Sequence, residues 1–363
     1  MKVFILGKIR GVYRTQQLIK SLLNIDNVQI SYMGFEITQS NRILSWISKV
    51  GYSIQAIALI WCCDIVFVPA MQHDTCLLKI AKALKKKIIV DYYISYYDTF
   101  VLDRKELKES ALKSKRLYKR DKYALLNADR CLFLNNAEKE YYCKVADVKT
   151  ERVNSMIIPL VISPKKKAHM DYFAGKRDTM NLCWTGSYIP LQGLDKIIKM
   201  MTYVKQKNLN CHLYIWGDKD LKAAPYLEMI RKNHLEKYIT VHNEWGNIKA
   251  WQDFIISKCD VCMGIFGDSE KAKTVCANKV VDGVAFGTPV ITAYSKGVEE
   301  FFADGEGIYF TSNIPEDIFS AVYKLYSLNY EKISVGLENS MNIYNKVFSV
   351  KAFEDKLNKA LEV

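Results

Sequence analysis

The sequence is poor in the residues that build metal centres and disulfide frameworks. Its 363 residues include five histidines, and none of them has the HxxxH spacing of a zinc-binding helix. The ten cysteines are scattered, and the single CxxC, from Cys259 to Cys262, has no second pair to complete a zinc set. We therefore expect no metal and no bound cofactor, and we expect reduced cysteines in a cytoplasmic protein.

The sequence also lacks the patterns of targeting and membrane-spanning segments. The first residues, MKVFILG, indicate a β-strand and have neither the charged head nor the long apolar segment of a secretory signal. The most apolar window, residues 50–70, is interrupted by Gln55 and Asp64. A helix followed by a strand explains this window better than a membrane span does.

What the sequence does contain is apolar residues and positive charge. Half of the chain is hydrophobic and 12% is aromatic, which excludes a disordered chain, and 363 residues suffice for two domains with separate cores. The formal net charge of +13 favours an anionic partner, either a nucleotide, a nucleic acid or the cytoplasmic face of a membrane. No recognition motif supports a nucleic acid, so we expect none as a partner.

The first half alternates short apolar runs with helical patterns, which is the rhythm of a parallel sheet covered by helices. A glycine turn after the first run indicates a Rossmann-like unit, although a full GxGxxG is missing. We expect strands over residues 2–6, 28–32, 65–68, 86–90, 130–134 and 157–161. We expect helices over residues 13–23, 43–62, 77–84, 105–122 and 137–144.

The second half repeats the rhythm after a linker, residues 163–180, that mixes proline, glycine and charge. Strands are expected over residues 181–185, 211–215, 239–241, 259–265 and 290–292. We expect helices from residue 194, over residues 250–257 and over residues 279–286. The predicted domains are residues 1–165 and 166–345, and residues 346–363 form an amphipathic C-terminal helix that can return across the linker.

Polar residues at the C-terminal edge of the first sheet are candidates for binding and catalysis, because ligand sites of open parallel sheets lie at that edge. A carboxylate there can take a proton from a hydroxyl group or orient a sugar, and we expect Asp98 to have this role. Each candidate is also explained by an ordinary structural role in a loop. The candidates are Gly7, Arg10, His73, Asp91, Asp98, Asp103 and Arg104.

Residues 105–122 hold eight lysines or arginines against three acids. A helix with a strongly basic face is expected here. A solvated surface helix explains the run, and so does contact with a phosphate-rich acceptor or with anionic lipid headgroups. Contact with anionic lipid headgroups predicts a peripheral protein on the inner face of the cell membrane.

The stretch from residue 257 to 301 has the order strand, basic glycine-containing loop, helix and strand. The loop contains Lys271 and Lys273, and we expect Asn278 to be the N-cap of the helix over residues 279–286. Free backbone amides and the helix dipole make such a helix start an anion site. The same order is also that of an ordinary crossover between strands.

Four motifs in the second half stand at the order and spacing of a known family. Ala285 to Ile291 reads AFGTPVI and matches the pattern A-x-G-x-P-V-I, and Gly186 and Gly193 match the two glycines of a donor loop. The other two motifs are Trp216-Gly217-Asp218 and Cys259-Asp260-Val261. The chain thereby resembles glycosyltransferase family 4, of the bacterial surface-polysaccharide type. The resemblance implies an α/β protein of the GT-B fold, with two Rossmann-like doubly wound parallel-sheet domains facing a cleft.

The resemblance implies transfer of a sugar from a UDP- or GDP-linked donor to a glycan acceptor, with retention and without a metal. The expected acceptor is a lipid-linked glycan of cell-surface polysaccharide synthesis. The group transferred to it is expected to be hexosyl or N-acetylhexosaminyl. The first domain would hold the acceptor, with Asp98 and His73 as catalytic candidates. The second domain would hold the donor through Gly186, Gln192, Gly217, Trp245, Lys271, Asn278, Lys279 and Asp282.

Four positions depart from the family pattern. Ser187 and Gln192 replace the arginine and lysine that hold the diphosphate, and Thr274 replaces the first of two glutamates, while Asp282 replaces the second. Lys271, Lys273 and Lys279 can supply the missing charge. The departures leave two other functions open, a nucleotide-sugar epimerase on the same fold and a catalytically silent nucleotide-binding partner of a transferase.

Overall fold

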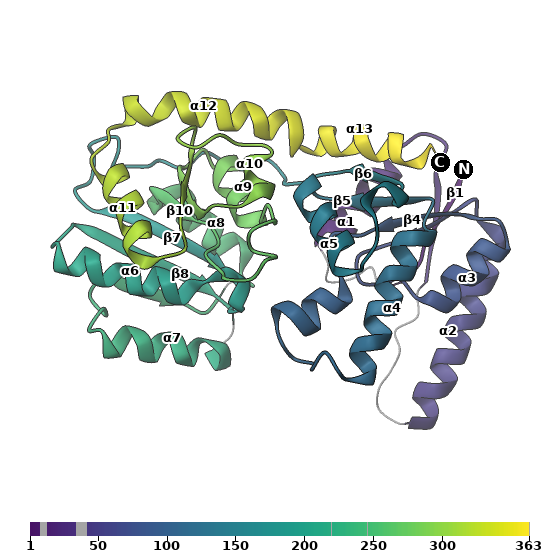
Figure 1. Cartoon of the computed structure of the whole chain (residues 1–363). Helices are drawn as coiled ribbons and strands as arrows, with labels where there is room; N and C mark the ends of the chain where they lie inside the picture. Colours follow the sequence, from purple (N-terminus) through teal and green to yellow (C-terminus); the bar gives the residue numbers. More distant parts are fainter. Residues whose placement is uncertain (8–12, 34–41, 219, 245, 363) are drawn as a thin grey trace. The chain divides into compact units, whose positions relative to one another are not determined.

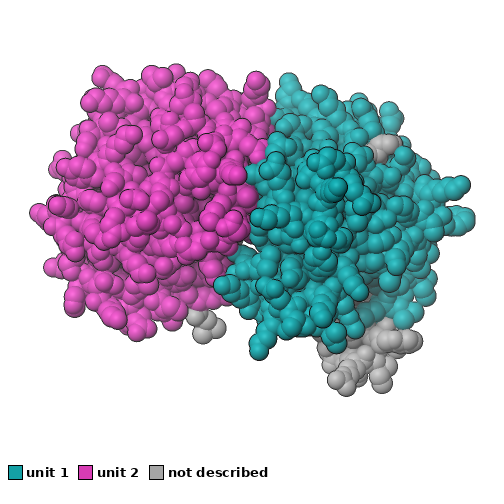
Figure 2. Space-filling view, in the orientation of Figure 1, with its two compact units in different colours: residues 1–161, 350–363 teal, residues 162–349 magenta. Residues whose placement is uncertain are grey.

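The computed structural model describes the whole chain except residues 8–12, 34–41, 219, 245 and 363. The chain divides into two compact units, shown in different colours in Figure 2. Unit 1 contains residues 1–161 and 350–363, and unit 2 contains residues 162–349. The sequence placed the two boundaries at residues 165 and 345.

Unit 1 is built on a six-stranded sheet in the order β2-β1-β3-β4-β5-β6, in which every pair is parallel. This strand order is that of a doubly wound sheet, as the alternation of strands and helices predicts. The strands are β1 (Lys2–Ile5), β2 (Gln29–Tyr32), β3 (Ile65–Val68), β4 (Lys87–Asp91), β5 (Arg130–Phe133) and β6 (Ser155–Ile157).

Helices cover both faces of this sheet, because both faces are apolar. Side chains of α2 to α5 pack on one face with Phe4, Val66 and Val90, and α1 and α13 pack on the other face with Val3 and Phe67 (Figure 1). The helices are α1 (Tyr13–Leu23), α2 (Arg42–Cys62), α3 (Thr75–Ala83), α4 (Leu112–Asn127), α5 (Asn136–Val145) and α13 (Val350–Leu361).

Unit 2 has a second six-stranded parallel sheet, in the order β12-β11-β10-β7-β8-β9. Its strands are β7 (Met180–Gly186), β8 (Cys211–Gly217), β9 (Ile239–His242), β10 (Val261–Met263), β11 (Val290–Ala293) and β12 (Ile308–Thr311). Its helices are α6 (Leu194–Gln206), α7 (Asp220–Lys232), α8 (Ile248–Lys258), α9 (Asn278–Ala285), α10 (Lys296–Glu299), α11 (Pro315–Tyr326) and α12 (Tyr330–Val347).

Three local predictions are wrong. The basic helix begins at Leu112 and not at residue 105, because Ala111 has the extended backbone of an N-cap residue. The strand predicted over residues 157–161 is β6 and ends at Ile157, since Pro159 cannot donate to a ladder. The loop after β4 contains a short π-helix, Asp98–Asp103.

Two further properties concern membrane spans and cysteines. Among the described residues, no helix is long and apolar enough to cross a membrane. All ten cysteines are free thiols, and Cys259 and Cys262, at 3.8 Å between sulfurs, are buried.

Candidate functional site

The loop after β7 approaches the loop after β10 very closely. It runs from Gly186 to Gly193 and includes one turn of 3-10 helix, Pro190–Gln192. Gly193 has φ of +60°, and a Cβ there would lie 2.3 Å from the backbone carbon of Phe266. Only glycine combines this left-handed conformation with so close an approach. The two loops are therefore fixed against each other at the C-terminal edge of the sheet.

Lys279, in the first turn of α9, reaches into this corner. Its side chain is buried, and its Nζ lies 4.1 Å from the ring centre of Trp184. The Nζ would be 3.1 Å from a Cβ at Gly186, a residue with φ of +151°. Burial holds the pKa of Lys279 well below its usual value of 10.5.

Gln192 meets Lys279 at the same place. Its Oε1 would lie 3.6 Å from the same Cβ position at Gly186. Both the Gln192 Oε1 and the Lys279 Nζ are buried without a hydrogen-bond partner among the described residues. Buried polar atoms without partners are rare in folded proteins and often mark a place where a ligand binds.

The start of α9 differs from the prediction in one respect. Its N-cap is Ala277, which has extended backbone with φ of −77° and ψ of 148°, and Asn278 is the first helical residue. Asn278 is exposed and makes no capping bond, so the prediction of Asn278 as the N-cap is wrong. The first turn of α9 has no side-chain cap. The amide of Val280 donates to the Ala277 carbonyl at 3.0 Å, so the amides of Asn278 and Lys279 are the ones that another acceptor can use.

Asp282 lies one turn further along α9. Its carboxylate is 3.6 Å from Nζ of Lys165, and 21% of its side chain is exposed. Burial raises the pKa of Asp282 from 3.8 to about 6, and Lys165 opposes this shift. Lys165 was not among the candidates, because nothing in its local sequence indicates this pair. Thr274, which replaces the other glutamate, donates its hydroxyl hydrogen bond to the carbonyl of Lys271, 3.1 Å away, and Lys271 is itself buried.

Aromatic residues line the strand ends beside this corner. Tyr188 stacks on Trp184 at 6.0 Å between ring centres, and its hydroxyl donates to Oδ1 of Asn243 at 2.8 Å. A Cβ at Gly217 would lie 1.8 Å from that hydroxyl, so glycine is required there. Trp245, a predicted donor residue, lies outside the described residues.

In unit 1, Asp91 forms a buried ion pair with Arg14. The guanidinium Nε of Arg14 donates to both carboxylate oxygens, at 2.9 and 3.1 Å, and its other nitrogens donate to the carbonyls of Pro159 and Ile158. The pair joins α1, the end of β4 and the segment after β6. The ion pair gives Asp91 a structural contact, and its predicted role on the acceptor side stays a prediction. Arg14 was missed because nothing in a helix sequence shows which arginine points inward.

His73 and Asp98 belong to a buried network centred on Asp121. The carboxylate of Asp121 lies 2.6 Å from Nε2 of His73 and accepts from the Ser95 hydroxyl at 2.6 Å. Asp98 is fully buried and accepts a hydrogen bond from the hydroxyl of Tyr141. His73 and Asp98 are thus hydrogen-bonded to neighbouring side chains, and a catalytic role for either one stays a prediction. Asp121, the one acid of α4, was missed by the sequence analysis.

The remaining described candidates of unit 1 lie in the segments after two strands, β1 and β4. Asp103 is buried at the end of the π-helix, and Arg104 is exposed and pairs with Glu106 at 3.7 Å. Gly7 follows β1 with φ of +121°, and a Cβ there would lie 2.6 Å from Cβ of Gln72. Arg10 lies outside the described residues.

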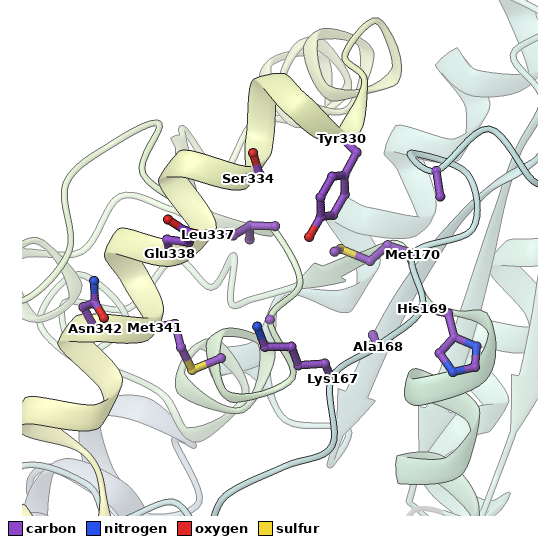
Figure 3. Close-up of a pocket in the computed structure, with 12 residues that line it drawn as sticks. Lys167, Ala168, His169, Met170, Tyr330, Ser334, Leu337, Glu338, Met341 and Asn342 are labelled. Carbon is purple, nitrogen blue, oxygen red and sulfur yellow. The ribbon is translucent and has the colours of Figure 1, made fainter.

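A separate pocket of about 550 Å³ lies in unit 2 between residues 167–170 and α12 (Figure 3). The close-up shows Lys167 and Tyr330 directed toward the cavity and His169 directed away from it. None of the predicted donor residues lines this pocket. Within the described parts of the chain, no group of three histidine, cysteine or acidic side chains is arranged to hold a metal ion.

Comparison with known proteins places the corner at Lys279 in a recognised domain. Residues 179–327 match the family model described as "Glycosyl transferases group 1". No curated protein matches the sequence.

Several solved structures have the same two-domain architecture at low sequence identity. Sucrose-phosphate synthase from Thermosynechococcus elongatus has a TM-score of 0.72 at 10% identity, over 99% of this chain and 98% of that one. HepE of Anabaena, solved with UDP and glucose, has a TM-score of 0.69 at 12% identity, over 100% and 99% of the two chains.

The third comparison is with WaaG, a glycosyltransferase involved in lipopolysaccharide biosynthesis. It has a TM-score of 0.65 at 12% identity, over 100% of this chain and 99% of that one. Two parallel six-stranded sheets with helices on their faces agree with the fold that these proteins share. The chain therefore has the two-domain α/β GT-B fold, and its second unit carries a domain that matches the group 1 glycosyltransferases.

Proposed function

We propose that the protein is a glycosyltransferase that binds a nucleoside diphosphate sugar in unit 2. The observation that supports this most directly is the meeting of Lys279 and Gln192 at Gly186. A buried amine and a buried amide oxygen, neither with a hydrogen-bond partner among the described residues, face a glycine that has no side chain of its own. A diphosphate supplies the negative charge and the acceptor oxygens that the Lys279 amine lacks.

The diphosphate is also the group that needs stabilisation during transfer. As the bond from the anomeric carbon to the donor oxygen breaks, negative charge develops on the departing diphosphate. Lys279 and the uncapped amides of α9 are placed to balance that charge, in the role that the family gives to an arginine and a lysine. This electrostatic role requires no metal and no protein nucleophile, and we infer retention from the family resemblance.

The other proposed contacts with the donor lie beside the same corner. Asp282, one turn after Lys279, is proposed to accept hydrogen bonds from the ribose hydroxyls. UDP is the first nucleotide to test, because HepE was solved with UDP and UDP-glucose. Unit 1 is proposed to bind the acceptor, a lipid-linked glycan of surface-polysaccharide synthesis.

One observation favours a second candidate, a catalytically silent nucleotide-binding protein. Thr274 has no carboxylate, and its hydroxyl is already bonded to the Lys271 carbonyl. A protein of this kind would bind the nucleotide and release no sugar. An epimerase would need acid and base groups beside the sugar, whereas Lys279 and Asp282, the titratable groups described at the donor corner, are proposed to contact the diphosphate and the ribose.

Incubation with UDP- and GDP-linked sugars separates these functions. We expect slow release of free sugar from one donor, because transferases hydrolyse their donors when no acceptor is present. Interconversion of two donors would instead identify an epimerase. Nucleotide binding without hydrolysis, also in the presence of membrane glycolipid extracts, would identify a silent protein.

A further inference from the structure

Helix α2 exposes an apolar stripe that no other part of the described chain covers. Val50, Ile54, Ile57 and Trp61 are 39, 64, 38 and 67% exposed, and their spacing of four, three and four residues places them on one side of the helix. No residue from 50 to 62 carries a charge. An uncharged helix face of this length is characteristic of an interaction surface.

The stripe is not a part of the core that has been left open. Ala56 and Ile60, on a different side of α2, are completely buried in the cluster that joins α2, α3 and α4 to the sheet. The helix therefore has two apolar sides, one facing the sheet and one facing solvent. A surface helix normally has a polar side toward water.

The helices beside α2 are strongly basic. Lys79 of α3 lies 5.7 Å from the ring centre of Tyr123, and Lys82 of α3 donates to Asn127 at 2.9 Å, so the lysines of α3 extend along α4. On α4, the exposed cations include Lys115, Arg116 and Lys119. Helices α2, α3 and α4 together contain ten lysines or arginines and one acid, the buried Asp121.

The exposed side chains of α2, α3 and α4 face the same way. All three helices cover one face of the unit 1 sheet, and Figure 1 shows them next to one another there. Side chains that point away from the sheet on α2, α3 and α4 therefore share one outer surface, which we call the α2–α4 surface. It combines an uncharged apolar stripe with a field of positive charge.

We propose that the α2–α4 surface binds a membrane that contains anionic lipids, with α2 lying in the plane of the interface. Val50, Ile54, Ile57 and Trp61 enter the boundary between headgroups and acyl chains, and the cations of α3 and α4 contact the headgroups. Trp61 is the type of residue that favours this boundary. The proposal concerns a surface outside the donor corner and does not depend on sugar transfer.

Charge decides between a membrane and a second copy of the chain. Two copies joined through α2 would bring the same basic helices near each other, and like charges across an interface oppose association. An anionic lipid surface complements both parts of the α2–α4 surface. The apolar and electrostatic contributions to membrane binding can be separated, because salt weakens only the electrostatic one.

Sedimentation with vesicles of phosphatidylcholine, with and without phosphatidylglycerol, tests the proposal. The test variant is Ile54→Ser with Trp61→Ser, and the control is Leu23→Ser, since Leu23 is 66% exposed on α1, at the other face of the sheet. We expect the wild type and the control to bind anionic vesicles and to stay partly bound at high salt. The double variant should bind at least ~10-fold more weakly and be released completely by salt.

The proposal is wrong if the double variant binds vesicles as the wild type does, or if the wild type remains in the supernatant at low salt. Sedimentation equilibrium without lipid tests the second copy: a dimer that the double variant abolishes would overturn the membrane assignment. Thermal unfolding confirms that the variants fold. Donor hydrolysis by the double variant should be unchanged, which keeps failure of this proposal distinct from failure of the proposed function.

Discussion

The proposed donor site depends on Lys279. Because this lysine is buried, we predict that it gains a proton when a nucleoside diphosphate binds. Its pKa is lowered well below 10.5, and a diphosphate nearby favours the charged amine. Binding of UDP should therefore be accompanied by uptake of a proton by Lys279. The affinity for UDP should fall as the pH rises through the pKa that Lys279 has in the protein without nucleotide. Calorimetry in buffers of different ionisation enthalpy measures this uptake.

In Lys279→Met the proton uptake should disappear, while Lys273→Met should keep it, because Lys273 is exposed and pairs with Glu270. Equal proton uptake in the wild type and in Lys279→Met would show that another group titrates.

The raised pKa of Asp282 should make the unfolding free energy of the protein depend on pH. Its pKa is about 6 in the folded protein and 3.8 without the surroundings, so the folded state binds the proton more tightly. The contribution of Asp282 to stability is therefore present below about pH 4 and is lost as pH rises to about 6. Relative to wild type, Asp282→Asn should gain roughly 2–3 kcal/mol in unfolding free energy between about pH 4 and about pH 7.

Thermal unfolding of wild type and variant across this pH range checks the sign. Asp268→Asn, a change at an exposed carboxylate of the same unit that pairs with Lys196, is the control. A stability difference between wild type and Asp282→Asn that does not change with pH would contradict the account.

Asp98 predicts a split between binding and turnover. It is fully buried and accepts a hydrogen bond from the hydroxyl of Tyr141, so we expect it to act as a positioning residue on the proposed acceptor side. Asp98→Asn should leave UDP affinity unchanged while transfer falls at least ~10²-fold, and Tyr141→Phe should act in the same direction. Normal transfer by both variants would remove this pair from the acceptor site.

At the scale of elements, the Arg14–Asp91 pair predicts the stability of unit 1. It connects α1, β4 and the segment after β6 through buried hydrogen bonds. Asp91→Asn leaves a buried arginine without its carboxylate and should cost about 3–5 kcal/mol of unfolding free energy in urea titrations. Arg104→Ala, which removes an exposed pair, should cost less than about 1 kcal/mol. Similar losses in both variants would contradict this role.

The elements themselves were largely predictable, because short apolar runs alternate with amphipathic segments along both halves. The C-terminal helix predicted within residues 346–363 is α13, Val350–Leu361. Boundaries that depend on backbone conformation were not predictable: Ala277 rather than Asn278 caps α9, and α4 begins seven residues late.

For the candidate site, sequence motifs identified Gly186, Gln192 and Lys279, and the structure brings these three together. The contacts that give them their properties join residues far apart in the chain. Trp184 beneath Lys279, Lys165 beside Asp282 and Asp121 beside His73 are examples. Such pairs depend on which side chains point inward, and no local pattern records that.

For the whole molecule, the central claim is that a positively charged two-unit GT-B chain binds a nucleoside diphosphate through Lys279. Calorimetric titration of UDP, GDP and their monophosphates at fixed salt tests it most directly. The wild type should bind one diphosphate at least ~10-fold more tightly than its monophosphate, Lys279→Met should lose that preference, and Lys273→Met should keep it. An unchanged preference in Lys279→Met, or no binding of either diphosphate by the wild type, would contradict the claim.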